Sequence, residues 1–175
     1  MRAAFLFFTR QNKHGEDTMH NWERLADRLK HEADLLSSRL DARALAQRFQ
    51  DGWGNIVNDG TDIVACAFLW PTPDDKWHEL GSIWTSPHRR GNNLGARVFR
   101  ACSAIARNRK QNTFLITKHP RIEHLAMSEG WQRATRETWI TVPWSASCGP
   151  CDRVLDKMRC PMRATLDCRM FFLAF

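Results

Sequence analysis

The sequence HELGSIWTSPHRRGNNLG, residues 78–95, decides the fold of this chain. Its first half is rich in apolar and β-branched residues and predicts a strand that ends before Pro87. A basic turn containing Gly91 follows. Apolar residues then recur at helical spacing through residues 94–106, so a helix is expected there. Because the first turn of a helix presents unsatisfied N–H groups and its dipole favours negative charge, this stretch predicts an anion site, most often for phosphate.

The turn at residues 90–95, Arg-Gly-Asn-Asn-Leu-Gly, resembles the acetyl-CoA-binding loop of the GNAT N-acetyltransferase superfamily, written Arg/Gln-x-x-Gly-x-Gly/Ala. Asn93 stands where the first motif glycine is usual, and asparagine tolerates a left-handed backbone better than most residues. Residues 129–131, Glu-Gly-Trp, resemble the family's Leu-Gly-Phe ending of its last helix. These motifs cover about residues 77–131. The alternative is an ordinary strand–turn–helix whose glycines only make a tight turn.

The resemblance implies where a cofactor would bind. The strand would splay from its neighbour near its end, leaving backbone groups for the pantetheine arm and an N–H that stabilises the oxyanion forming at the thioester. The pyrophosphate would lie on the backbone amides of the turn, with arginine charge added. The alternative is that the arginine side chains do not contact phosphate and only form a solvated basic turn. The expected cofactor-binding residues are Ile83, Trp84, Thr85, Arg89, Arg90, Gly91, Asn92, Asn93, Leu94, Gly95 and Ala96.

Glu79 is the first choice for a catalytic residue, because many family members carry a glutamate on this strand near the acceptor site. Acetylation of an amine needs the neutral amine, and a carboxylate can remove its proton directly or through water. The alternative for Glu79 is a surface residue paired with a basic neighbour. His78 ranks second, since alternation on a regular strand points it to the opposite face.

Two family positions depart from the usual residues. The tyrosine that commonly protonates the leaving CoA thiolate falls at Ala126, and this chain contains no tyrosine. The asparagine that often lies near the pantetheine falls at His119. This histidine either replaces the asparagine's hydrogen bond, serves as the acid that protonates the thiolate, or is an ordinary loop histidine. Solvent can protonate the CoA thiolate, so the absence of the tyrosine is compatible with catalysis. A non-catalytic CoA-binding relative also stays open.

Composition limits the class of protein. With 175 residues, 43% hydrophobic and 26% charged, the chain fits one globular domain. No apolar run is long enough to span a membrane, and residues 3–8 are too short for a secretory signal, so we expect a cytoplasmic protein.

A net charge of +7 favours anionic partners, either CoA or nucleic acid. Five basic residues would line a nucleic-acid groove or form a polar helix face: Arg97, Arg100, Arg107, Arg109 and Lys110.

The expected fold is α/β of the α+β kind, with a mixed, mostly antiparallel sheet of about seven strands and about four helices in a single domain over residues 1–175. Four helices are predicted. The first begins with a cap at Asp17 or Thr18 and runs to about Ser38, and the second begins after a cap at Asp41. The third and fourth cover residues 94–106 and 121–129. The predicted strands are residues 3–9, 55–57, 63–70, 77–85, 113–117, 132–142 and 166–175.

The cysteines allow two interpretations. Cys148 and Cys151 form a C-x-x-C motif too close to the end of the chain for a thioredoxin fold. Together with Cys160 and Cys168 they either hold zinc or stay reduced in an irregular segment at about residues 143–165. The spacing is unlike common zinc modules, and we assign no metal. The two others, Cys66 and Cys102, fit core positions.

The sequence therefore predicts an acetyl-CoA-dependent N-acetyltransferase that acts on a primary amine by direct transfer in a ternary complex. The alternatives are an inactive CoA-binding protein of the same fold and a basic RNA-associated protein, with or without transfer to an RNA-linked amine. The acceptor, a small molecule, a peptide or an RNA-linked amine, depends on residues 10–20 and 71–76, which carry no specificity signal. No membrane partner is expected. The oligomeric state is open, a homodimer being one option.

Overall fold

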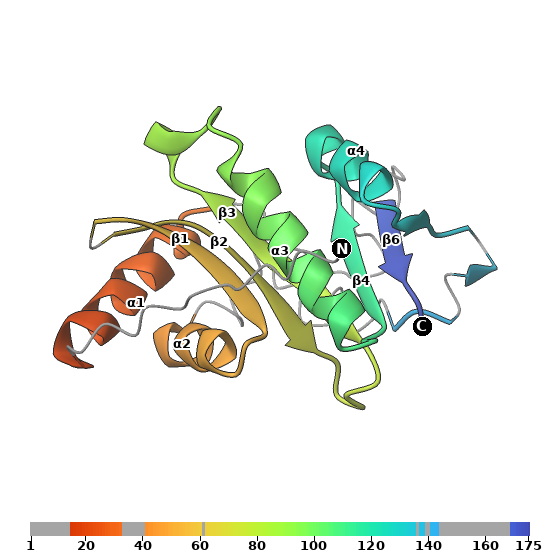
Figure 1. The fold of residues 1–175 in the computed structure, drawn as a ribbon, viewed down its shortest axis with the longest axis horizontal. Helices are drawn as coiled ribbons and strands as arrows, with labels where there is room; N and C mark the ends of the chain where they lie inside the picture. The colour runs from red at the N-terminus through yellow and green to blue at the C-terminus, as the bar shows by residue number, and fades with distance from the viewer. Residues whose placement is uncertain (1–14, 33–40, 61, 136, 139–140, 144–168) are drawn as a thin grey trace, which may run out of the picture.

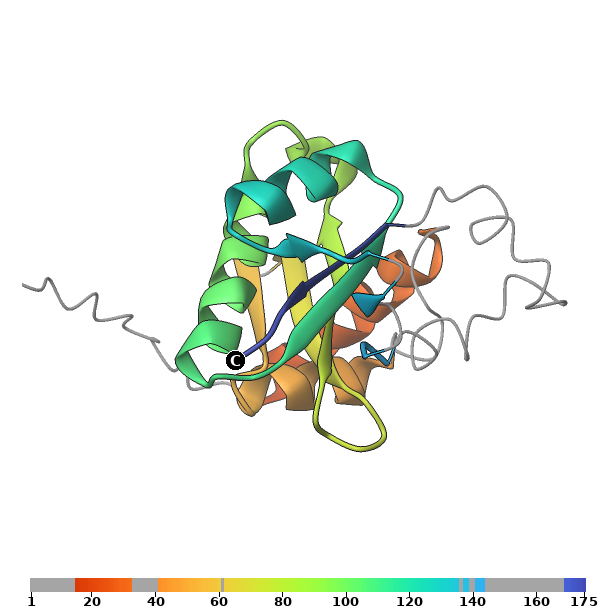
Figure 2. The same ribbon diagram turned by 90° about the vertical axis from the view of Figure 1, so that its right-hand side faces the viewer.

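The computed structural model describes residues 15–32, 41–60, 62–135, 137–138, 141–143 and 169–175. Within them, one mixed sheet of six strands has helices on both faces (Figures 1 and 2). None of the helices in this part of the chain is long and apolar enough to cross a membrane. The predicted strand at residues 3–9 and the cysteine segment at residues 143–165 lie almost wholly outside the described residues.

The sheet order is β1-β2-β3-β4-β6-β5. Its strands are β1 (Gly54–Asp59), β2 (Asp62–Pro71), β3 (His78–Thr85), β4 (Thr113–Thr117), β5 (Gln132–Arg133) and β6 (Arg169–Leu173). The first two form the predicted hairpin, whose turn includes Gly60 at φ +61°. All neighbouring pairs are antiparallel except β3 and β4, which run parallel. The sheet is thus mixed and mostly antiparallel, as predicted.

Four α-helices cover the described sheet: α1 (Gly15–Lys30), α2 (Ala42–Gln50), α3 (Leu94–Asn108) and α4 (Pro120–Ser128). Figure 2 shows α1 and α2 on one face and α3 and α4 on the other. On the first face, Trp22, Leu25 and Leu29 of α1 pack with apolar residues of β2 and β3. On the second face, Val98 and Phe99 of α3 pack with Ala126 and the strands. The sheet therefore separates two apolar clusters, and its strand ends lie between the two helical layers.

Helix boundaries confirm some sequence signals and correct others. Asp41 caps α2 as predicted, because its Oδ1 accepts a hydrogen bond from Ala44 N at 2.9 Å. The prediction for α1 was wrong at both ends. The helix already includes Gly15, so Asp17 and Thr18 do not cap it, and it ends at Lys30 instead of Ser38. At that end His31 N donates to Arg28 O, three residues back, which is a turn rather than a helical bond.

The predicted strand at residues 132–142 was wrong over most of its length. Among the residues that the structure describes, Gln132 and Arg133 pair with β6, and Ala134 N donates one further hydrogen bond to Met170 O at 2.9 Å. Beyond them, Thr135 N donates to the Thr138 hydroxyl at 2.7 Å, and that hydroxyl donates to Thr135 O at 3.2 Å. Such local side-chain bonds compete with a strand ladder, and the threonines that predicted a strand form a turn instead.

Candidate functional site

Strands β3 and β4 form a wedge. They pair at only two positions, His78 with Thr113 and Glu79 with Phe114. From Leu80 to Thr85, β3 has no pairing with β4. The sheet therefore contains the divergence that the resemblance implied near Ile83, and it begins earlier, directly after Glu79.

A bulge in β3 lies inside the diverging part. The register with β2 shifts between Cys66 and Phe68, and Ser82 has a positive φ of 51°. Positive φ is uncommon for a residue other than glycine and is concentrated at functional sites. The Ser82 hydroxyl accepts a hydrogen bond from Trp70 Nε1 at 3.2 Å. Because the bulge reverses the alternation, Trp84 packs toward α1, whereas Leu80 packs toward α3.

The loop after β3 leads into α3 without a side-chain cap. A short 3₁₀ turn, Pro87–Arg89, is followed by Gly91 at φ +92° and Asn93 at φ +60°. Asn93 thus adopts the left-handed conformation that a motif glycine would supply. The helical hydrogen bonds begin with Arg97 N donating to Asn93 O at 3.0 Å. The first turn of α3 therefore begins beside an exposed loop and has no side-chain cap, and such helix starts favour anions.

The two arginines of the loop are tied to other elements. Arg89 pairs with Asp59 at the end of β1. Arg90 donates to Glu32 Oε1 at 2.8 Å and to Thr85 O at 3.2 Å. Both side chains thus have protein partners and hold the loop against the sheet and α1. Sequence reasoning missed Asp59 and Glu32, because they lie 30 and 58 residues away along the chain and carry no motif of their own.

Glu79 is buried and lies at the closed end of the wedge. Its side chain is on the α1–α2 face of the sheet, because its register partners there are Trp70 on β2 and Phe114 on β4. Only 7% of Glu79 is exposed. Glu79 is therefore not a surface residue, which corrects that part of the alternative.

His78 is also buried and lies on the opposite face of the sheet from Glu79, as predicted, which is the α3 side. Its ring stacks on Trp53 with centroids 4.3 Å apart, and Arg109 lies over Trp53 at 3.9 Å. Burial, and next the charge of Arg48, lower the pKa of His78 to about 4, so the ring is neutral at pH 7. Its Nδ1 has no hydrogen-bond partner among the described residues. His78 therefore belongs to the packing between β3 and the end of α3, on the face opposite Glu79.

Replacing His78 by phenylalanine should make stability less dependent on pH. An unfolded histidine takes up a proton below about pH 6.5, whereas folded His78 resists protonation until about pH 4. The folded state is therefore favoured above pH 6.5 and loses about 3 kcal/mol as the pH falls to 4. In His78→Phe, which keeps a ring against Trp53, this loss should disappear from urea unfolding measured between pH 7 and 4. The same pH dependence in both proteins would contradict the assignment.

The positions that depart from the family lie in different surroundings. Ala126 is fully buried in the cluster between α3, α4 and the sheet. His119 is exposed at the start of α4, where its backbone N donates to the Thr117 hydroxyl at 3.1 Å.

Cys66 and Cys102 are buried free thiols, as predicted. Burial raises the pKa of both thiols, that of Cys102 to about 12, so neither is a nucleophile at neutral pH.

The five basic residues considered for a nucleic-acid groove are largely engaged within the protein. Arg100 Nε donates to Glu129 Oε1 at 2.7 Å, and Arg107 donates to the backbone carbonyl of the same residue. Arg109 Nη2 donates to Asp51 O at 3.1 Å. These three side chains therefore pack α3 against its neighbours, which favours the polar helix face over the groove.

Cys148, Cys151, Cys160 and Cys168 lie outside the described residues. Within the described part of the chain, no group of three or more histidine, cysteine, aspartate or glutamate side chains is arranged to hold a metal.

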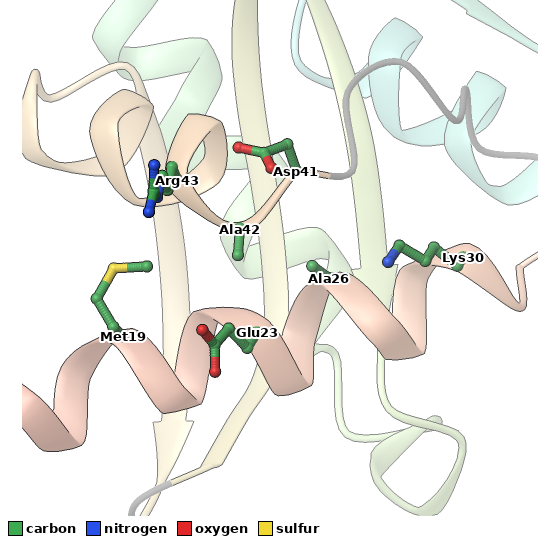
Figure 3. A pocket seen from close by; sticks show the side chains of 7 residues that line it. All are labelled: Met19, Glu23, Ala26, Lys30, Asp41, Ala42 and Arg43. Carbon is green, nitrogen blue, oxygen red and sulfur yellow. The ribbon is translucent and has the colours of Figure 1, made fainter.

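A hollow of about 450 Å³ lies between α1 and α2 (Figure 3). Its lining is of mixed charge and comprises Met19, Glu23, Ala26, Lys30, Asp41, Ala42 and Arg43. It contains none of the predicted site residues. We place the candidate site at the wedge and the loop, where backbone donors, a positive φ and a buried carboxylate occur together, rather than at this hollow.

Parallel strands β3 and β4 thus diverge, and α3 follows without a side-chain cap, in a mixed α/β domain. Residues 16–133 match the sequence model described as the acetyltransferase (GNAT) family, so the chain belongs to the GNAT acetyltransferase family. No curated protein matches the chain.

Solved structures share the fold at low identity. An acetyltransferase from Streptococcus agalactiae is 19% identical with a TM-score of 0.57, over 94% of this chain and 95% of that one. An N-acetylglutamate synthase from Neisseria gonorrhoeae, complexed with coenzyme A and N-acetyl-glutamate, is 16% identical with a TM-score of 0.54, over 91% of this chain and 33% of that one. A ribosomal-protein-alanine N-acetyltransferase from Brucella melitensis is 18% identical with a TM-score of 0.54, over 67% and 83%.

Proposed function

We propose that this protein transfers an acetyl group from acetyl-CoA to the nitrogen of a primary amine. Family membership supports acetyl transfer in general. The observation that carries the finer proposal is the order of features along one stretch: a buried carboxylate at Glu79, the divergence of β3 from β4 directly after it, and the uncapped start of α3. These features would serve as a base, a slot for an extended thioester and a phosphate site, and they follow one another in the order that the reaction needs.

In this proposal the cofactor binds along β3 and the loop. Backbone groups of Ile83 to Thr85, which β4 does not pair with, would hold the pantetheine arm. The amides from Gly91 to Ala96 would bind the pyrophosphate, with the helix dipole favouring its charge. Two features of the structure support this: the left-handed Asn93 and the absence of a side-chain cap on α3. The side chains of Arg89 and Arg90 would act mainly by holding the loop.

Glu79 is proposed as the general base. It would take a proton from the acceptor ammonium, and the neutral nitrogen would attack the thioester carbonyl carbon. The C–N bond forms, the nitrogen gives up its second proton to solvent, and the C–S bond breaks. CoA leaves as a thiolate that solvent protonates, because the chain contains no tyrosine. Direct transfer in a ternary complex is favoured over an acetyl-cysteine intermediate, since the two described thiols are buried and held protonated.

Two measurements test this function in sequence. Calorimetric titration of the purified protein with CoA and acetyl-CoA should show binding of both at one site. A thiol-release assay with acetyl-CoA and a panel of primary amines, including small amines, peptide N-termini, lysine peptides and aminoacyl-tRNA, should then identify the acceptor class. Binding without turnover of any amine would favour the inactive CoA-binding alternative. Failure to bind either cofactor would overturn the proposal.

A further inference from the structure

One carboxylate joins two residues of the candidate cofactor site to α1. Glu32 lies just beyond α1, where its backbone N donates to Leu29 O at 3.1 Å. Its Oε1 accepts hydrogen bonds from Trp84 Nε1 at 3.0 Å and from Arg90 Nη2 at 2.8 Å. The donors lie 52 and 58 residues further along the chain, one in the diverging part of β3 and the other in the loop before α3. The end of α1 is thus bonded directly to both halves of the site.

Arg90 is anchored at two points. Besides the bond to Glu32, its Nε donates to Thr85 O at 3.2 Å. The guanidinium therefore bridges the last residue of β3 and the end of α1. Because Arg90 immediately precedes Gly91 and the left-handed Asn93, fixing its side chain restrains the backbone that the proposed pyrophosphate site uses.

Trp84 makes this contact more than a surface ion pair. The Arg90 and Glu32 side chains are 56% and 33% exposed, and such pairs alone contribute little. Trp84, however, is only 4% exposed and packs with α1 residues in the apolar cluster. Its indole N–H has Glu32 as its acceptor, and removing that acceptor would leave a buried donor unsatisfied. The carboxylate is therefore required by a buried group as well as by the loop arginine.

We propose that Glu32 is a positioning residue for the cofactor. It holds Trp84 and Arg90 so that the end of β3 and the loop at residues 90–95 keep the shape that presents their backbone N–H groups to CoA. This inference rests on the proposed function, because it concerns the same site. It predicts an effect on cofactor affinity rather than on the chemical step, since Glu32 acts through the loop and not on the reacting atoms.

Replacing Glu32 by alanine should weaken CoA binding about 10-fold, the loss expected when a charge-assisted contact that orders a binding loop is removed. With the amine that the panel identifies, KM for acetyl-CoA should rise by a similar factor while kcat at saturation changes less than about two-fold. Glu23→Ala is the matched control, because Glu23 lies on α1 with a 64% exposed side chain, and its ion-pair partner is His20, three residues earlier on the same helix. It should bind CoA as the wild type does.

A double-mutant cycle shows whether Glu32 acts through Arg90. Arg90→Ala alone should weaken CoA binding by a factor similar to that of Glu32→Ala, and the double variant should lose clearly less than the product of the two factors. Should Glu32→Ala fail to fold, Glu32→Gln supplies the test. It keeps an acceptor for Trp84 but removes the charge facing Arg90, and binding about three-fold weaker is expected.

Three results would overturn the inference: unchanged CoA affinity in the folded variants, tighter binding, or losses that multiply fully in the double variant. Tighter binding would mean that Glu32 only competes with the pyrophosphate for Arg90. Each of these results requires a wild type that binds CoA, so they are distinct from failure of the proposed function, in which the wild type itself does not bind.

Discussion

Replacing Asn93 by glutamate is expected to weaken acetyl-CoA binding by about 100-fold or more. Asn93 has φ +60° and immediately precedes α3, whose first turn has no side-chain cap. A carboxylate at this position would repel the pyrophosphate and would itself accept hydrogen bonds from the N–H groups that the phosphate needs. Glutamate also adopts a positive φ less readily than asparagine. Calorimetric titration with acetyl-CoA measures the change.

Asn93→Gly is the matched control. Glycine is the residue usual at this position in the family's motif, and it adopts positive φ at no steric cost. Binding in this variant should remain within about three-fold of the wild type. If Asn93→Glu bound acetyl-CoA as tightly as the wild type, the start of α3 would not be the phosphate site.

Replacing Glu79 by glutamine should lower kcat by about 100- to 1000-fold at pH 7, the range typical for loss of a general base. Glutamine has nearly the same shape as glutamate, so residue 79 should keep its place between its cross-strand partners Trp70 and Phe114. The dissociation constant for acetyl-CoA should not change, because Glu79 lies at the closed end of the wedge, away from the loop. Thiol release at saturating acetyl-CoA and amine gives kcat.

The pH dependence of Glu79→Gln separates a base from a structural carboxylate. As the pH rises toward the pKa of the acceptor amine, solvent supplies the neutral amine, and the deficit should shrink. A deficit that stays constant with pH would assign Glu79 a structural role, and unchanged acetylation at pH 7 would remove it from the mechanism.

Local signals in the sequence predicted the parts of the fold that local physics determines. The Asp41 cap, the hairpin around Gly60 and the helix at residues 94–106 all depend on neighbours within a few residues, and all are found. The conformation of Asn93 was also predicted, because few residues other than glycine and asparagine fit a left-handed turn.

Long-range contacts explain what the sequence did not predict. Apolar spacing beyond Lys30 favoured a longer α1, but the chain turns at His31, where Glu32 reaches Trp84 and Arg90. Tertiary bonding here overrides helical periodicity. Likewise, nothing local to Glu32 or Asp59 indicates that they anchor the loop arginines. The burial of Glu79 depends on two neighbouring strands, so sequence alone could not distinguish it from a surface residue.

Hydrogen–deuterium exchange of the backbone amides, followed by mass spectrometry with and without saturating acetyl-CoA, tests the central claim most directly. The claim is that the cofactor binds along the diverging part of β3 and the start of α3. Exchange is predicted to slow in peptides covering residues 82–97 and to stay unchanged in peptides covering α2, which lines the hollow between the first two helices. Protection confined to α1 and α2, with none over residues 82–97, would contradict the account.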